Sequence, residues 1–148
     1  LIFALNHFLG FANQHEAFLF GVGSLGSSLL HDHGLLQYGL KILAAFDVKH
    51  ELVGTQINRI PIHHVNHFMS LQKQMNVHIG VLTVPVDNAQ EVADVMIAGG
   101  IRAIWNFTPF RIRVPENIVV QNTSMYAHLA LIFNRLKEEL ETEKHEDV

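Results

Sequence analysis

Glycines at positions 21, 23 and 26 form the run Gly-Val-Gly-Ser-Leu-Gly. An apolar run over residues 17–22 leads into them, and a helix is predicted to begin at Ser24. In such a turn the first glycine permits the bend, the second lets a pyrophosphate approach the backbone, and the third lets the helix pack against the strand. The first N–H groups of the helix offer partial positive charge to phosphates. The spacing favours dinucleotide binding, although a tight turn that binds nothing would use the same glycines.

A carboxylate, Asp47, ends the next apolar run and follows Gly26 by 21 residues. At this point of a strand–turn–helix unit, a carboxylate accepts hydrogen bonds from both hydroxyls of an adenine-linked ribose. Its charge repels a 2′-phosphate, so the sequence favours NAD(H) over NADP(H). The alternative is a solvated strand end without a ligand.

Two further stretches, residues 83–85 and 106–109, come at the ends of predicted strands. Ligands of open α/β sheets bind outside the carboxyl ends of the strands, so both stretches are expected to line the far half of the same ligand. Pro85 and Pro109 are equally compatible with a plain end of each strand. With their neighbours, these motifs give the predicted cofactor-binding residues: Gly21, Val22, Gly23, Ser24, Leu25, Gly26, Asp47, Val48, Lys49, Thr83, Val84, Pro85, Asn106, Phe107, Thr108 and Pro109.

The sequence shows no pattern of side chains that could carry catalysis. It has no Ser-x-x-x-Lys or Tyr-x-x-x-Lys pair, no nucleophile elbow and no paired carboxylates after a strand. Among the 11 histidines, His63 and His67 would share one face of a helix, but no HExxH pattern completes a zinc site. Because the chain has no cysteine, disulfides, thiolate metal sites and a cysteine nucleophile are excluded. We therefore predict no catalytic residues, no metal and no enzyme activity.

The composition is typical of one folded domain: 148 residues, 49% hydrophobic and 16% charged. These values exclude a disordered linker and a coiled coil, and the net charge of −4 gives no bulk attraction to nucleic acid. No apolar run reaches the about 20 residues that span a bilayer, and residues 1–11 lack the basic start and the cleavage site of a signal peptide. We expect a cytoplasmic protein that does not enter a membrane. Because the first residue is Leu1, we also expect the sequence to be a piece of a longer chain.

Apolar periodicity predicts strands and helices in alternation. Near-continuous apolar strands separated by helices indicate a parallel sheet that is covered on both faces. The fold class is therefore α/β, a Rossmann-like, doubly wound, mostly parallel sheet with a C-terminal dimerisation helix. The strands are expected over residues 17–22, 41–46, 60–62, 77–84, 101–107 and 118–121, and the helices over residues 1–9, 24–32, 65–75, 88–98 and 124–143.

The last predicted helix carries an apolar stripe that is longer than the edge of a small domain needs. Its members are Met125, Leu129, Ile132, Phe133, Leu136 and Leu140. Packing within the chain would explain the stripe. Docking on a second subunit would explain it as well and would give a two-fold dimer.

Over about residues 18–136 the sequence resembles the Rex family of redox-sensing transcriptional repressors. The resemblance lies in the runs GVGSLG, AAFDVK, VGTQINRIPI, VLTVP, AGGIRAIWNFTP and VPENI, in this order. It implies an N-terminal winged-helix DNA-binding domain, a Rossmann domain, and a C-terminal helix exchanged between the subunits of a homodimer. It also implies that NADH closes the dimer and releases operator DNA.

The same resemblance assigns parts of this chain. Gly21, Gly23 and Gly26 would hold the pyrophosphate, and Asp47 would hold the adenine ribose. The stretches at 83–85 and 106–109 would line the ribose and nicotinamide side. Residues 1–11 would end a connecting helix, residues 12–122 would form the NAD(H)-binding domain, and residues 123–148 would form the dimerisation helix and an acidic tail. Operator DNA would bind only through an N-terminal domain that this sequence does not contain.

The chain departs from the usual family pattern at two positions. Asp32 stands where the family usually has a tyrosine, and Ser124 aligns where it usually has an aspartate. Both positions couple the cofactor to dimer closure in the family, so the resemblance implies dinucleotide binding but leaves open which redox form binds tighter. Two other functions stay open as alternatives: a fragment of a small NAD-dependent oxidoreductase, and a CoA-binding domain of the succinyl-CoA synthetase type, against which Asp47 argues.

Overall fold

The computed structural model describes residues 15–32, 34–37, 39–123 and 135–143. The predicted helix over residues 1–9 lies outside these ranges, as do Ser124 and the first part of the predicted helix over residues 124–143. Residues 135–143 are helical, which agrees with the end of that prediction.

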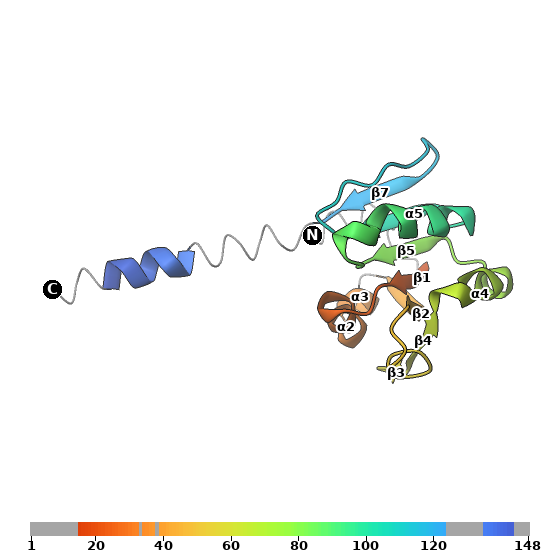
Figure 1. Cartoon of the computed structure of the whole chain (residues 1–148), viewed down its shortest axis with the longest axis horizontal. Helices are drawn as coiled ribbons and strands as arrows, with labels where there is room; N and C mark the ends of the chain where they lie inside the picture. Colours follow the sequence, from red (N-terminus) through yellow and green to blue (C-terminus); the bar gives the residue numbers. More distant parts are fainter. Residues whose placement is uncertain (1–14, 33, 38, 124–134, 144–148) are drawn as a thin grey trace.

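A seven-stranded sheet forms the centre of the described domain, in the order β3-β4-β2-β1-β5-β6-β7 (Figure 1). All its neighbouring strands are parallel except the pair β3 and β4. The chain winds outward from β1 in both directions, so the strand order reverses between β1 and β5. This is the doubly wound arrangement, and the predicted fold class is confirmed. The strands are β1 His15–Phe20, β2 Leu40–Asp47, β3 Gln56–Ile57, β4 Ile60–His64, β5 Ile79–Leu82, β6 Ala103–Asn106 and β7 Val119–Asn122.

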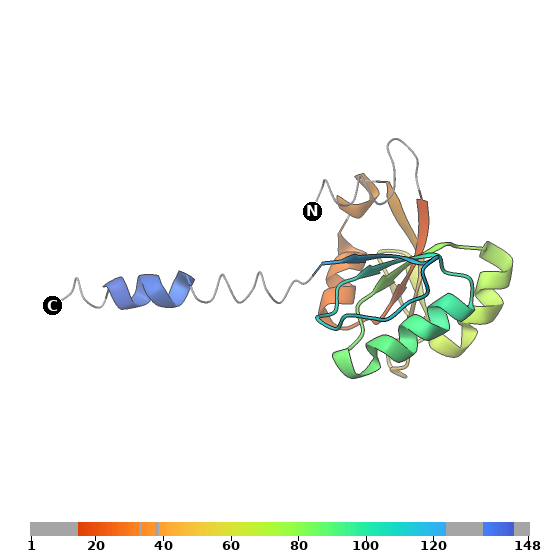
Figure 2. The ribbon, with the colours of Figure 1, turned by 90° about the horizontal axis from the view of Figure 1, so that it is seen from above.

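Helices cover both faces of the sheet (Figure 2). The helices α2 Ser24–His31 and α3 Gly34–Gln37 contribute Leu30 and Leu35 to the core on one face. The helices α4 Phe68–Met75 and α5 Ala89–Ala98 contribute Phe68, Ala93 and Met96 to the core on the other. Because each strand of the middle of the sheet is buried on both sides, its sequence is apolar without alternation.

The carboxyl ends of β1 and β2 are fixed by a cluster of aromatic rings. Phe68 of α4 makes edge-on contacts with Phe18, Phe20 and Phe46, at ring-centroid distances of 6.1, 5.1 and 5.6 Å. Phe20 and Phe46 are stacked on each other at 5.1 Å. Edge-on and stacked ring pairs add to the free energy that burial alone supplies. The cluster therefore holds rigidly the two strand ends that precede Gly21 and Asp47.

Several predicted boundaries differ from the structure. The strands predicted over residues 77–84 and 101–107 are shorter at both ends, and cover Ile79–Leu82 and Ala103–Asn106. Thr83, Val84 and Phe107, which follow these strands, line the cavity instead. The strand predicted to reach residue 22 ends at Phe20, because Gly21 has a φ of 103° that no extended strand adopts. The strand β3 and the short helix α3 lie in segments for which no element was predicted, and the predicted helix over residues 65–75 begins as a 3-10 turn.

We expect replacement of Arg59 by glycine to stabilise the domain by about 1 kcal/mol. Arg59 and Asn58 form the turn between β3 and β4 with φ of 67° and 51°, and a left-handed backbone costs roughly 1–2 kcal/mol for a residue with a side chain. The matched control is Asn58→Gly, which also relieves strain but loses the hydrogen bond from the Asn58 side chain to the Leu30 carbonyl oxygen at 3.3 Å. Urea unfolding of the three proteins measures the effect; a less stable Arg59→Gly variant would contradict it.

Candidate functional site

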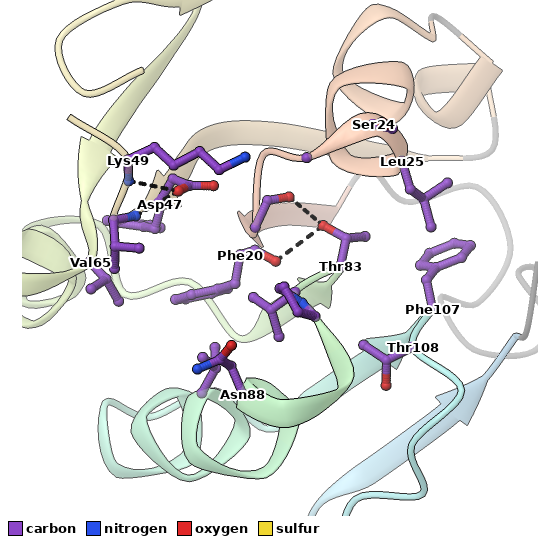
Figure 3. A pocket seen from close by; sticks show the side chains of 17 residues that line it. Phe20, Ser24, Leu25, Asp47, Lys49, Val65, Thr83, Asn88, Phe107 and Thr108 are labelled. Carbon is purple, nitrogen blue, oxygen red and sulfur yellow. Dashed lines mark hydrogen bonds between the residues drawn. The ribbon is translucent and has the colours of Figure 1, made fainter. Parts of the chain in front are cut away.

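A cavity of about 440 Å³ opens at the carboxyl ends of β1, β2 and β5, where the strand order reverses (Figure 3). Ligands of doubly wound sheets bind in this crevice. Most of the predicted cofactor-binding residues line it: Gly21, Gly23, Ser24, Leu25, Asp47, Val48, Lys49, Thr83, Val84, Pro85, Phe107 and Thr108. The topology brings these residues together although more than 80 positions of the sequence separate the first from the last.

The structure places four predicted residues away from the cavity wall. Val22 lines a neighbouring cavity of about 390 Å³, which shares Gly23, Ser24 and Lys49 with the first. Gly26 is buried at the contact of α2 with the turn. Asn106 is fully buried under the loop that follows β6, and Pro109 is exposed.

Five lining residues were not predicted: Phe20, Phe46, Val65, Asn88 and Val92. In the sequence, Phe20 and Phe46 have the pattern of core residues of strands, although they directly precede Gly21 and Asp47. Asn88 is a polar residue at the first position of the predicted helix over residues 88–98, three positions after Pro85, which is a signal that could have found it. Val65 and Val92 carry no such signal, because an apolar residue in a helical pattern is normally core.

The glycines of the turn have three different roles. A Cβ on Gly21 would lie 2.8 Å from the backbone carbonyl of Thr83, and a Cβ on Gly26 would overlap the carbonyl oxygen of Gly21. Both positions therefore exclude side chains because the protein itself fills the space. A Cβ on Gly23 would meet nothing within 4 Å. The missing side chain at Gly23 leaves open space in front of the backbone at the start of α2, as the approach of a phosphate group requires.

Asp47 ties the glycine turn to the end of β2. Its Oδ2 accepts a hydrogen bond from the Val22 N–H at 2.6 Å, and its Oδ1 accepts from Val48 and Lys49 N–H at 2.7 and 2.9 Å. A carboxylate has about four lone-pair sites, so three backbone donors leave Asp47 able to accept hydrogen bonds from a ligand as well. The carboxylate is thus a structural anchor of the turn, and its contact with both ribose hydroxyls stays a prediction.

The hydroxyl of Thr83 joins the end of β5 to the same turn. Its Oγ1 lies 2.6 Å from the Gly21 carbonyl oxygen and 3.1 Å from that of Phe20, and Figure 3 shows both contacts. The Thr83 N–H also donates to the Phe20 carbonyl oxygen at 2.9 Å. Thr83 thus serves as a brace for the turn, which the sequence alone did not show.

We expect Thr83→Val to lower the free energy of unfolding by about 1 kcal/mol. Valine keeps the branched shape but cannot donate to the Gly21 carbonyl oxygen, and one intramolecular hydrogen bond contributes about that much. Thr83→Ser is the matched control because it keeps the hydroxyl. Chemical denaturation followed by circular dichroism measures the difference, and a valine variant as stable as the serine variant would refute the brace.

At the other end of the cavity, Asn106 holds the loop that carries Thr108. The Asn106 side chain accepts from the Thr108 N–H and hydroxyl at 3.0 and 2.7 Å, and donates to the Phe110 carbonyl oxygen and to Asn122 at 2.7 and 3.0 Å. Asn106 is 0% exposed, so its amide finds all these partners inside the protein. It supports the cavity wall from behind.

Charge is unevenly distributed along the cavity. Among its lining residues, Asp47 and Lys49 are the charged ones, and both come from the end of β2. Figure 3 shows Leu25 and Phe107 next to each other at the opposite end. Within the described ranges, no group of His, Asp and Glu side chains is placed to hold a metal ion. The arrangement therefore suits an elongated ligand with phosphates at its middle, a hydroxylated part near Asp47 and an uncharged ring against Leu25 and Phe107.

Comparison with known proteins gives a consistent picture. A family model described as "CoA binding domain" matches residues 12–110. The chain is 65% identical over 136 residues to the redox-sensing transcriptional repressor Rex of Bacteroides fragilis, covering 92% of this chain and 62% of that protein. It is 39% identical over 140 residues to the protein of the same name from Treponema denticola, covering 93% of this chain and 67% of that protein. The chain thus spans 62% of the length of the Bacteroides relative.

Among solved structures, the fold is similar to that of RSP, described as a Rex-family repressor. The crystal structure of RSP with β-NADH has a TM-score of 0.79 and 29% sequence identity, and it covers 94% of this chain and 68% of RSP. The structure of RSP with β-NAD+ and operator DNA has a TM-score of 0.78 and 29% identity, covering 94% and 64%.

Proposed function

The chain belongs to the Rex family of redox-sensing transcriptional repressors and, through residues 12–110, to the CoA binding domain family, and we propose that it is the NAD(H)-binding, dimerising regulatory domain of such a repressor. The observation that carries the proposal is the open space in front of Gly23, at the start of α2 and beside Asp47. A pyrophosphate fits there against backbone N–H groups, with a ribose within reach of the carboxylate.

The residues of this chain have separate tasks in the proposal. Gly23 and Ser24 take the pyrophosphate, and Asp47 takes a hydroxyl of the adenine ribose. The nicotinamide lies toward Leu25 and Phe107, near the end of β6. Ligand binding here serves as a signal rather than as a step of a reaction, so we propose no catalytic activity. The relatives are named as repressors, which supports that view.

The lining of the nicotinamide end favours the reduced ligand. The ring of NAD+ carries a positive charge, whereas the ring of NADH is neutral. Leu25, Val84 and Phe107 offer this ring no carboxylate, and transfer of an unpaired charge into an apolar site is costly. We therefore propose that NADH binds more tightly than NAD+, although Asp32 and Ser124 replace the residues that couple binding to dimer closure in the family.

We propose that NADH binding leads to release of operator DNA, as a redox-sensing repressor requires. RSP has been crystallised with NAD+ and operator DNA, and separately with NADH, which supports this assignment. This chain has a net charge of −4 and spans 62% of the length of the Bacteroides relative, so we place DNA contact in a part of the full-length protein that this sequence does not contain.

Such a regulator acts in the cytoplasm. Over the described part of the chain, none of the helices has the length and apolar character needed to cross a membrane.

We propose that the C-terminal segment pairs two subunits. Leu136 and Leu140 belong to the apolar stripe of the sequence and lie on the helix over residues 135–143, where 52% and 54% of each side chain is exposed. Apolar side chains at helical spacing that find no cover within the described structure fit a homodimer interface. Analytical ultracentrifugation of the chain and of a Leu136→Asp/Leu140→Asp variant tests this, with a dimer expected for the first and a monomer for the second.

Thermal unfolding with NADH, NAD+, NADPH and CoA in parallel tests the ligand. At a ligand concentration 100 times its Kd, binding stabilises a protein by about 2.7 kcal/mol. We expect a clear rise of the melting temperature with NADH, a smaller one with NAD+ at the same concentration, and none with NADPH or CoA. Equal shifts with NADH and NAD+ would refute redox selectivity, and a shift with CoA alone would refute the assignment to NAD(H).

A further inference from the structure

The cavity has two arms that lie against different faces of the sheet. Leu25 and Phe107 belong to the core on the side of α2 and α3. Phe46, Val65 and Val92 belong to the core on the side of α4 and α5. The second arm lies next to Asp47, because Asp47 pairs with His64 in the sheet and Val65 follows directly.

The second arm has an apolar lining that suits a flat base. A ribose held by Asp47, in the function proposed above, directs its base into this arm, because the pyrophosphate occupies the space at Gly23. Val65, Val92 and Phe46 contribute apolar side chains to its lining, and Phe46 is 1% exposed. Apolar walls bind any purine, so they do not distinguish one base from another.

Asn88 also lines this arm, and its side chain is polar and uncharged, in contrast to the apolar residues around it. It ends the 3-10 turn Val86–Asn88 directly before α5, is exposed, and makes no side-chain hydrogen bond that caps α5. Within the described part of the chain, its carboxamide has no hydrogen-bond partner. Figure 3 shows Asn88 on the same side of the cavity as Phe20, with Phe107 on the opposite side. Its donor and acceptor are therefore available to a ligand.

We propose that Asn88 recognises the base of the bound dinucleotide, through the edge of adenine formed by the 6-amino group and N1. A carboxamide offers one acceptor for the amino group and donors for the ring nitrogen, which makes the two edges complementary. The carboxamide can also rotate by 180°, so a purine with a 6-oxo group would still find a hydrogen-bond donor and an acceptor. A base whose edge is blocked would find none, and this property makes the assignment testable.

The probes are NADH and 1,N6-etheno-NADH, which differ only in a two-carbon bridge that blocks the 6-amino group and N1. We expect the full chain to bind NADH about tenfold more tightly than the etheno compound, as one to two hydrogen bonds would give. Asn88→Leu should weaken NADH binding about tenfold and leave the etheno compound unchanged, so that the ratio of the two Kd values approaches one. Asn117→Leu, the same change at an exposed asparagine that does not line the cavity, is the matched control and should behave as the unmodified chain.

The possible outcomes separate the two proposals. Equal affinity of the unmodified chain for both ligands, or an equal loss for both in Asn88→Leu, overturns the role of Asn88 while NAD(H) binding stands. Failure of the folded, unmodified chain to bind either ligand overturns NAD(H) binding and the role of Asn88 together. Circular dichroism without ligand verifies folding of each variant.

Discussion

Replacement of Gly23 by valine is expected to weaken NADH binding by at least about 100-fold, which corresponds to about 2.7 kcal/mol, while the free chain stays as stable as before. The backbone at Gly23 has φ of −87° and ψ of −156°, an extended conformation outside the left-handed region that favours glycine. A Cβ added there would meet no protein atom within 4 Å. The added side chain therefore costs the fold little and occupies the space that the pyrophosphate needs.

Titration of NADH by calorimetry, together with thermal unfolding of the free proteins, tests this expectation. Gly23→Ala is an informative intermediate, because a single methyl group should reduce affinity less than the branched valine does. Two results would contradict the assignment of the phosphate site: undiminished NADH binding by a folded Gly23→Val variant, or a large loss of stability in that variant without ligand.

The same type of change three residues later is expected to act on the fold. Gly26→Ala should lower the free energy of unfolding by about 3 kcal/mol, because the new Cβ would overlap the Gly21 carbonyl oxygen and lie 3.0 Å from the Thr83 hydroxyl. Neither the backbone of the turn nor Thr83, which is fixed by its hydrogen bonds, can move easily. The helix α2 must then move away from β1, and the glycine turn moves with it.

Urea unfolding without ligand measures this loss. Ser28→Ala, at an exposed position of the same helix, is the matched control and should change stability by less than about 0.5 kcal/mol. If Gly26→Ala were as stable as the control, the close packing of α2 against the turn would be refuted. Together, the variants at Gly23 and Gly26 separate a glycine that makes room for a ligand from a glycine that makes room for the protein.

The predicted part of the site consists of residues whose types and spacing form a motif along the chain. Gly21, Gly23 and Gly26 are visible in a sequence because their spacing, after an apolar strand and at the start of a helix, is typical of a phosphate-binding turn, and Asp47 is visible because it ends a buried strand at a set distance. The fold class is visible for a similar reason: strands buried on both faces are apolar without interruption, and helices are apolar at every third or fourth position. Such features need no knowledge of which elements are neighbours.

The tertiary structure decided which distant residues share the cavity. Val65 reaches it because β4 pairs with β2, and Asn88 and Val92 reach it because α5 packs on the same face as Phe46. It also decided that Asn106 lies buried behind the wall, and that three backbone N–H groups already occupy most of the Asp47 carboxylate. These facts depend on strand order, on the face that each helix covers and on which hydrogen bonds remain unfilled. They arise from contacts between segments far apart in the chain, so the spacing of residues along the sequence does not contain them.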